Sequence, residues 1–240
     1  MILIKWMDRK FYPKFKKNWD DILFRKNILE KTNNPELKVL LDFGAGRGHI
    51  KYLNFKGIFS KTVGVDICSS ILENSFLDEA KKISNGKLPF KDNYFDIVIS
   101  NNTVEHLDAP SETFLEINRV LKNEGSFFFK TPNKFHYVAL ISSITPIWFH
   151  KFYKKLMGTK VIDTFPTKYK ANSENLVKNL ARKTHFDIVS IKTVEGRPEY
   201  LRVFWIFYIF GIIYERVVNK FKFLSLAKCV LYVNLKKNKN

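Results

Sequence analysis

The sequence predicts an α/β fold in which a mostly parallel sheet carries helices on both faces. Three short apolar runs support this prediction, at residues 39–41, 62–67 and 94–100. Apolar runs of this length, bounded by turn signals, are typical of strands that are buried on both sides in a parallel sheet. A helical pattern separates the third run from a further strand-like run at residues 126–130, as in a strand–helix–strand unit.

The first apolar run ends in Asp42 and is followed by glycines at alternate positions, Gly44, Gly46 and Gly48. Glycine lets the chain turn sharply and expose its backbone to a ligand. The second run carries Asp66 near its carboxyl end. We therefore expect the glycine turn and the Asp66 carboxylate to lie side by side at one edge of the sheet. Open α/β sheets bind nucleosides there, and an acid at this place suits ribose hydroxyls.

The glycine spacing bears on which nucleoside cofactor binds. The dinucleotide fingerprint G-x-G-x-x-G would place its third glycine at position 49, which is His49. A pyrophosphate needs close backbone approach at a helix N-terminus, whereas S-adenosylmethionine (SAM) has no phosphate and its site can use a different turn. For the glycines taken alone, an ordinary tight turn between a strand and a helix is the alternative interpretation.

Helix signals follow the third apolar run. Residues 108–112 combine a capping acid or serine, an early proline and an acidic first turn, which together indicate a helix start. Phe114, Ile117, Val120 and Leu121 then recur at helical spacing. We expect residues 123–125, Asn-Glu-Gly, to end this helix before the strand at 126–130.

The chain resembles class I SAM-dependent methyltransferases of the type 11 family in five motifs that occur in the family's order: LLDFGAGRG, VGVDIC, LPFKDNYFDIVIS, VEHL and EINRVLKNEGSFFFKTPN. The resemblance covers roughly residues 38–133 and implies SAM as the cofactor. It also implies a Rossmann-like, doubly wound sheet of seven strands. Residues 185–191 and 229–235 would be its sixth and seventh strands, paired antiparallel at the sheet edge, and a hydrophobic helical insertion would lie between them.

The predicted cofactor-binding residues follow from the glycine turn and from the resemblance. The turn and the Asp42 carboxylate are assigned to the methionine end of SAM, and Asp66 to its ribose. Family members often carry an acid near Ser84 that contacts the adenine amino group, and neutral side chains replace it here. The full predicted set is Asp42, Gly44, Ala45, Gly46, Gly48, Asp66, Ile67, Ser84, Asn85 and Asn101.

Methyl transfer mainly requires that nucleophile, methyl carbon and sulfur be held in line, and a general base is needed only if the acceptor must lose a proton. His106 and His136 are the candidate bases, and a structural histidine at a helix start is the alternative for His106. Resembling quinone-biosynthesis O-methyltransferases carry a metal-linked Glu three positions before the Glu105–His106 pair. That position is Asn102 here, so no metal is expected.

The bulk composition limits the function classes. A chain of 240 residues suggests one domain, with residues 1–37 as a helical cover, 38–133 as the SAM-binding core and 134–240 as insertions and final strands. Within the cover, residues 18–24 predict a helix over the sheet. Two cysteines exclude a disulfide framework and suit a reducing cytoplasm. The net charge of +18 favours an anionic partner, or is plain solvated surface.

Two features suggest a membrane surface as a partner. Basic residues interleaved with aromatic ones gather at residues 10–17, 151–155 and 220–222, a pattern that fits a membrane interface at least as well as nucleic acid. The apolar run at 203–214 is too short for a membrane span of roughly 20 residues. It is either a buried helix packed on the sheet edge, or a helix that dips into one leaflet with Arg202, Arg216, Lys220 and Lys222 at the headgroups.

The expected function is methyl transfer to a small-molecule or lipid-like acceptor by a cytoplasmic enzyme, peripheral on the inner face of the membrane if the second interpretation holds. The alternatives are an RNA or protein methyltransferase and a SAM-binding protein without turnover. The motif of nucleic-acid amino-methylating enzymes, Asn/Asp-Pro-Pro-aromatic, is replaced at residues 100–103 by Ser-Asn-Asn-Thr, and neither cysteine follows a proline. Nucleic acid is therefore disfavoured as the substrate.

Overall fold

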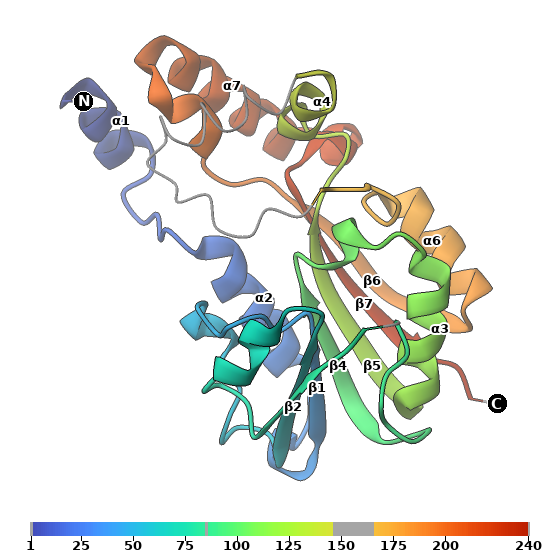
Figure 1. Cartoon of the computed structure of the whole chain (residues 1–240). Coiled ribbons are helices and arrows are strands. Elements are labelled where there is room, and N and C mark those ends of the chain that lie inside the picture. Colours follow the sequence, from blue (N-terminus) through green and yellow to red (C-terminus); the bar gives the residue numbers. More distant parts are fainter. Residues whose placement is uncertain (1, 85, 146–165, 240) are drawn as a thin grey trace. The chain divides into compact units, whose positions relative to one another are not determined.

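The computed structural model describes residues 2–84, 86–145 and 166–239 (Figure 1). Contacts divide the chain into two compact units, and each is described by itself. The first unit comprises Met1–Trp19, Pro132–Pro166 and Thr193–Val230, and the second comprises Asp20–Thr131, Thr167–Lys192 and Leu231–Asn240. The partition of a single domain at residues 37 and 133 stays a prediction.

Seven strands form one sheet in the order β3-β2-β1-β4-β5-β7-β6. Their bounds are β1 Val39–Phe43, β2 Lys61–Asp66, β3 Glu79–Lys82, β4 Phe95–Asn101, β5 Leu121–Pro132, β6 Phe186–Val194 and β7 Val230–Lys237. The first five strands pair in parallel. Just past β7, the amide of Asn238 donates to the carbonyl of His185, just before β6, so these two strands run antiparallel. The predicted seven-stranded, mostly parallel sheet is confirmed.

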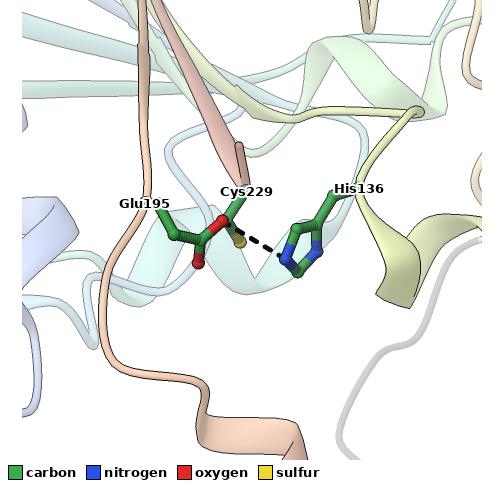
Figure 2. Close-up of side chains that lie close together, drawn as sticks. All are labelled: His136, Glu195 and Cys229. Atoms are coloured by element: carbon green, nitrogen blue, oxygen red, sulfur yellow. Dashed lines mark ion pairs between the residues drawn. The ribbon is translucent and has the colours of Figure 1, made fainter. Parts of the chain in front are cut away.

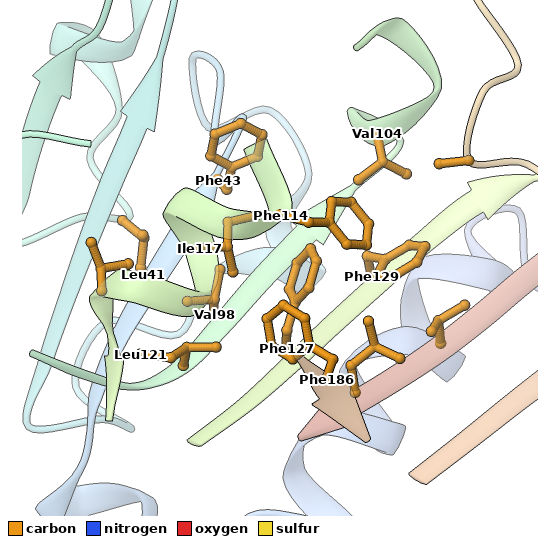
Figure 3. Close-up of a cluster of buried hydrophobic side chains, with 14 of the residues drawn as sticks. Leu41, Phe43, Val98, Val104, Phe114, Ile117, Leu121, Phe127, Phe129 and Phe186 are labelled. Carbon is orange, nitrogen blue, oxygen red and sulfur yellow. The ribbon is translucent and has the colours of Figure 1, made fainter. Parts of the chain in front are cut away.

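Two helices, α3 (Pro110–Val120) and α6 (Glu174–Lys183), cover one face of the sheet. Helix α6 begins where the Ser173 hydroxyl accepts a hydrogen bond from the Leu176 amide, which satisfies one of the free amides of its first turn. The predicted apolar stripe of α3 is confirmed, because Phe114 is fully buried and packs edge-on against Phe127 and Phe129 of β5 (Figure 3). This cluster is the main hydrophobic core of the second unit.

Helix α2 (Trp19–Glu30) covers part of the opposite face. Its Phe24 ring lies 6.3 Å from the ring of Tyr232 in β7. Its Arg25 stacks 4.8 Å from the Phe55 ring and donates to the carbonyls of Tyr52 and Asn54. The expectation of a covering helix at residues 18–24 is therefore met, and this helix also fastens the loop between β1 and β2.

No α-helix directly follows the glycine turn in the described part of the chain. Between β1 and β2 there is only a short 3₁₀ turn, η2 (Lys51–Leu53), and another, η3 (Ser69–Glu73), follows β2. The segment after Gly44 has no apolar helical period. It instead buries two isolated rings, Phe55 and Phe59, which pack edge-on 5.8 Å apart. Two further 3₁₀ turns are η1 (Pro35–Leu37) and η4 (Val104–His106).

The prediction that residues 123–125 end helix α3 is wrong. The helix stops at Val120, and Leu121 already pairs with Phe95 as the first residue of β5. Glu124 has a positive φ of 63°, and the register between β4 and β5 shifts at this point. The Asn-Glu-Gly turn signal therefore marks an irregularity inside a strand, which has the same backbone requirements as a helix end.

The first unit contains α1 (Ile2–Phe11), α4 (Tyr137–Ile144), α7 (Trp205–Lys220) and the 3₁₀ turns η5 (Glu199–Val203) and η6 (Lys222–Ala227). Helix α7 buries Tyr208 and Ile212 against Met7 of α1. The Tyr208 hydroxyl donates to Asp8 of α1 at 2.7 Å. Arg202 also pairs with Asp8, at 2.6 Å. Arg202 therefore joins the segment before α7 to α1, and the prediction that its side chain extends to lipid headgroups is not supported.

The apolar run at 203–214 is neither fully buried nor long enough to span a membrane. One face of α7 is buried, while large apolar side chains on the other are exposed: Trp205, Ile206, Phe207, Ile209, Phe210, Ile213 and Val217. Among the residues that the structure describes, no helix has the length and hydropathy to cross a bilayer.

Candidate functional site

The glycine turn after β1 lies against the end of β2. The amides of Gly44 and Ala45 both donate to the carbonyl of Val65, at 2.8 and 3.2 Å. Gly44 has a φ of 80°, and a Cβ atom placed on it would lie 2.2 Å from the Thr103 hydroxyl oxygen. Only glycine allows both this backbone conformation and so close an approach by the loop after β4. The predicted proximity of the turn to the end of β2 is therefore found.

Asp66 holds the turn through its carboxylate. One oxygen accepts from the amide of Gly46 at 2.9 Å, and the other accepts from the amide of Cys68 at 2.8 Å. Asn74 also holds the turn, because its side-chain amide donates to the backbone carbonyl of Gly46 at 3.0 Å. A carboxylate has about four lone-pair positions, so each oxygen of Asp66 keeps capacity for a ligand hydroxyl. Nothing lies within 4 Å of a Cβ atom placed on Gly46, so the turn is open there.

Asp42 is buried at the end of β1, with 5% of its surface exposed. Burial, with a smaller contribution from the negative charge of Asp66, raises the pKa of this carboxyl to about 7. A buried carboxylate favours a positively charged partner, which would lower the pKa again. The site is therefore electrostatically suited to a cationic group.

A second polar group lies where β4 and β5 end. The side-chain amide of Asn101 donates to Asp21 of α2 at 3.3 Å, while its buried oxygen Oδ1 has no hydrogen-bond partner in the described part of the chain. Lys130 is fully buried, and its Nζ lies 2.6 Å from both Asp20 and Asp21. These charges fasten the first turn of α2 to the sheet. Lys130 was not predicted from the sequence, although a lysine at the end of an apolar strand is an unusual residue and was the signal that could have found it.

The remaining predicted cofactor residues lie around the end of β2. Ile67 directly follows Asp66 and is 55% exposed. Ser84 is exposed and follows Ile83, whose amide donates to the carbonyl of Asp66. Asn85 lies outside the described residues. The structure thus brings the glycine turn, Asp42, Asp66, Ile67 and Ser84 to one edge of the sheet, while their role in binding stays a prediction.

The two candidate bases lie in different units. His106 is half-buried in η4, at the end of β4. Its neighbour Glu105 is buried, accepts from the Thr131 hydroxyl at 2.9 Å, and has a pKa that burial raises above the usual value. His136 belongs to the first unit and is 4% exposed. The catalytic role of either histidine stays a prediction.

A family model and two relatives match this chain. A family model described as "Methyltransferase domain" matches residues 41–129. The chain is 30% identical over 200 residues to the uncharacterized protein MJ1252 of Methanocaldococcus jannaschii. The match covers 75% of this chain and 76% of that protein. It is 35% identical over 136 residues to MJ0638 of the same organism, covering 54% of this chain but only 59% of that relative.

A solved structure shows the same fold. The protein YcgJ of Bacillus subtilis superposes with a TM-score of 0.56 at 15% identity, over 91% of this chain and 99% of that one. At this identity the likeness concerns the fold alone.

Proposed function

This chain belongs to the class I SAM-dependent methyltransferases, and we propose that it transfers the methyl group of SAM to a small-molecule or lipid-like acceptor. The observation that carries the proposal is the Asp66 carboxylate, which binds the glycine turn through Gly46. A lipid-like acceptor is supported by a separate feature, the exposed apolar face of α7.

The residues present at the sheet edge fit SAM, which supplies a methyl group on a positively charged sulfur. Asp42 offers a buried negative charge to the cationic end of the ligand. Asn101 offers a buried oxygen that lacks a donor among the described residues. Asp66 would hold the ribose hydroxyls while it keeps the turn in place, and Ile67 offers an exposed apolar side chain for the base.

His106 is the residue that we assign as general base for an acceptor hydroxyl, because it follows β4 and is half-exposed. Its replacement by alanine is expected to lower the rate of methyl transfer by about 100-fold or more without changing SAM affinity. Steady-state turnover and SAM titration on the same preparation would measure both quantities. Full turnover by the variant would remove His106 from the mechanism.

SAM binding is expected to depend on pH through Asp42. The ionised carboxylate attracts a cation, so below its pKa of about 7 binding must first release a proton. The affinity should therefore rise by about 25-fold between roughly pH 5.5 and 7.5, since each pH unit below the pKa lowers the ionised fraction about tenfold. Calorimetric titration of the wild type and of Asp42→Asn would test this, because the variant should show little pH dependence over that range. An equal pH dependence in the variant would contradict the assignment.

A lipid-like acceptor is supported by the surface of the first unit. Phe207 and Phe210 on α7 are 52% and 63% exposed, and basic residues occur near the end of the helix, at Arg216, Lys220 and Lys222. An amphipathic helix with this composition binds the interface of an anionic bilayer. Each basic residue near such a surface contributes about 1 kcal/mol. We therefore propose an anionic membrane surface as the partner.

Vesicle co-sedimentation tests this surface. The double variant Phe207→Glu, Phe210→Glu should lose most of its binding to phosphatidylglycerol vesicles. Leu37→Glu, which changes an apolar side chain that is 75% exposed in the second unit, should bind as the wild type does. Equal binding by all three proteins, or no binding by the wild type, would contradict the membrane proposal but not methyl transfer.

The acceptor itself would be identified by incubating the enzyme with radiolabelled SAM and a cell lysate, then separating lipid, small-molecule, RNA and protein fractions. Label in the lipid or small-molecule fraction is expected. Label in RNA or protein would favour the alternative substrates. SAM binding without label in any fraction would indicate a protein that binds the cofactor without turnover.

A further inference from the structure

Three side chains with metal-binding atoms converge in the first unit (Figure 2). His136 lies just before α4, Glu195 directly follows β6, and Cys229 directly precedes β7. Their donor atoms all lie within 4.8 Å of one another. The side chains of His136 and Glu195 are each 4% exposed, so the cluster is inside the unit rather than on its surface.

The separation of the His136–Glu195 pair, drawn as an ion pair in Figure 2, also suits two ligands of one metal ion. The Nε2 atom of His136 lies 3.4 Å from the carboxylate oxygen Oε2 of Glu195, which is longer than a usual N–H···O bond. Both atoms are buried, and neither has a hydrogen-bond partner among the described residues. Two ligands at roughly 2.0–2.1 Å from a tetrahedral ion lie about 3.3 Å apart. The observed distance between Nε2 and Oε2 is close to this ligand–ligand distance.

The backbone around the cluster is held in place independently of these three side chains. The amide of Asn133 donates to the carbonyl of Cys229 at 2.8 Å, and its side chain donates to the carbonyls of Leu226 and Lys228. The amide of His136 in turn donates to the carbonyl of Asn133. The segments that present the imidazole and the thiol are therefore joined through one residue, as in a preformed ligand site.

We propose that His136, Glu195 and Cys229 bind one zinc ion. Imidazole nitrogen, carboxylate oxygen and thiolate sulfur are the three ligand types that zinc takes in proteins, whereas magnesium and calcium prefer oxygen alone. An ionised Glu and Cys supply two negative charges, which a divalent ion balances in this buried place. Three protein ligands leave a fourth tetrahedral position for water or for a ligand atom.

The cluster belongs to the first unit, whereas the Glu105–His106 pair, at which no metal is expected, belongs to the second. The zinc proposal does not depend on the proposed methyl transfer. The three ligands follow β5, follow β6 and precede β7, so the ion would join three separate segments of the first unit. Metal binding to such a site stabilises the folded state, because the ligands converge only there.

The test uses the full chain, stripped with a chelator and then titrated with zinc against a chromophoric competitor. The wild type should bind one zinc ion per chain, and Cys229→Ser should weaken binding by at least about 100-fold. Cys68→Ser is the matched control, because Cys68 is the other cysteine of the chain and lies in the second unit. It should bind zinc as the wild type does.

Cobalt substitution gives a second readout that does not require a variant to fold. Cobalt-loaded wild type and Cys68→Ser should both show a near-ultraviolet thiolate-to-cobalt charge-transfer band, and zinc, but not magnesium, should raise the melting temperature of the wild type. Absence of the band from cobalt-loaded wild type would overturn the proposal. So would zinc binding that survives in Cys229→Ser but is lost in Cys68→Ser.

Discussion

Replacing Asp66 with alanine is expected to weaken SAM binding by at least about 100-fold. The substitution removes the two hydrogen bonds that the carboxylate accepts from the Gly46 and Cys68 amides, and with them the proposed contacts to the ribose. Hydrogen bonds to a charged group contribute about 1.5–3 kcal/mol each, and about 1.4 kcal/mol corresponds to a factor of ten in affinity. Isothermal titration with SAM would measure the loss.

Asp78→Ala is the matched control for this variant. Asp78 also accepts from a backbone amide of β2, that of Thr62 at 2.8 Å, but at the opposite end of the strand from the glycine turn. Its removal should leave SAM affinity unchanged. Circular dichroism would establish that both variants are folded. If the folded Asp66→Ala variant bound SAM as tightly as Asp78→Ala does, the proposed role of Asp66 would be wrong.

Replacing Lys130 with methionine is expected to destabilise the protein by about 3–5 kcal/mol, because it leaves buried carboxylates without their cation. Lys130 is fully buried between Asp20 and Asp21, and the side chain of Asp21 is only 10% exposed. The free energy of unfolding in urea would measure the change.

Lys122→Met serves as the comparison, because Lys122 lies on the same strand and pairs with Asp96 at a similar distance, 2.8 Å, but is 44% exposed. An exposed pair contributes only about 0–1 kcal/mol, so this variant should unfold nearly as the wild type does. Adding Asp20→Asn and Asp21→Asn to Lys130→Met should restore part of the lost stability. If the two lysine variants lowered the free energy of unfolding equally, burial would not determine the loss of stability.

Features that depend on residues close together in the sequence could be predicted from it. Strands β1, β2 and β4 were predicted because buried parallel strands are continuous apolar runs, and the turn at Gly44 was predicted because positive φ favours glycine. The adjacency of this turn to Asp66 followed from the rule that parallel strands end at one edge.

Features that depend on distant residues could not be predicted. Strand β3 (Glu79–Lys82) consists of three charged residues and one alanine and has no apolar pattern. Lys130 was missed because its partners lie on α2, more than a hundred residues earlier in the chain. The His136, Glu195 and Cys229 cluster has no motif spacing, since the three residues meet only when separate segments of the first unit fold together.

The division into two units has a consequence for folding. The first unit consists of three stretches, Met1–Trp19, Pro132–Pro166 and Thr193–Val230, with stretches of the second unit between them. Closing long loops carries an entropy cost that must be met before distant contacts form. We therefore expect the first unit to form late, after the segments that connect its pieces have become ordered. For the same reason, no single truncation can separate the two units from one another.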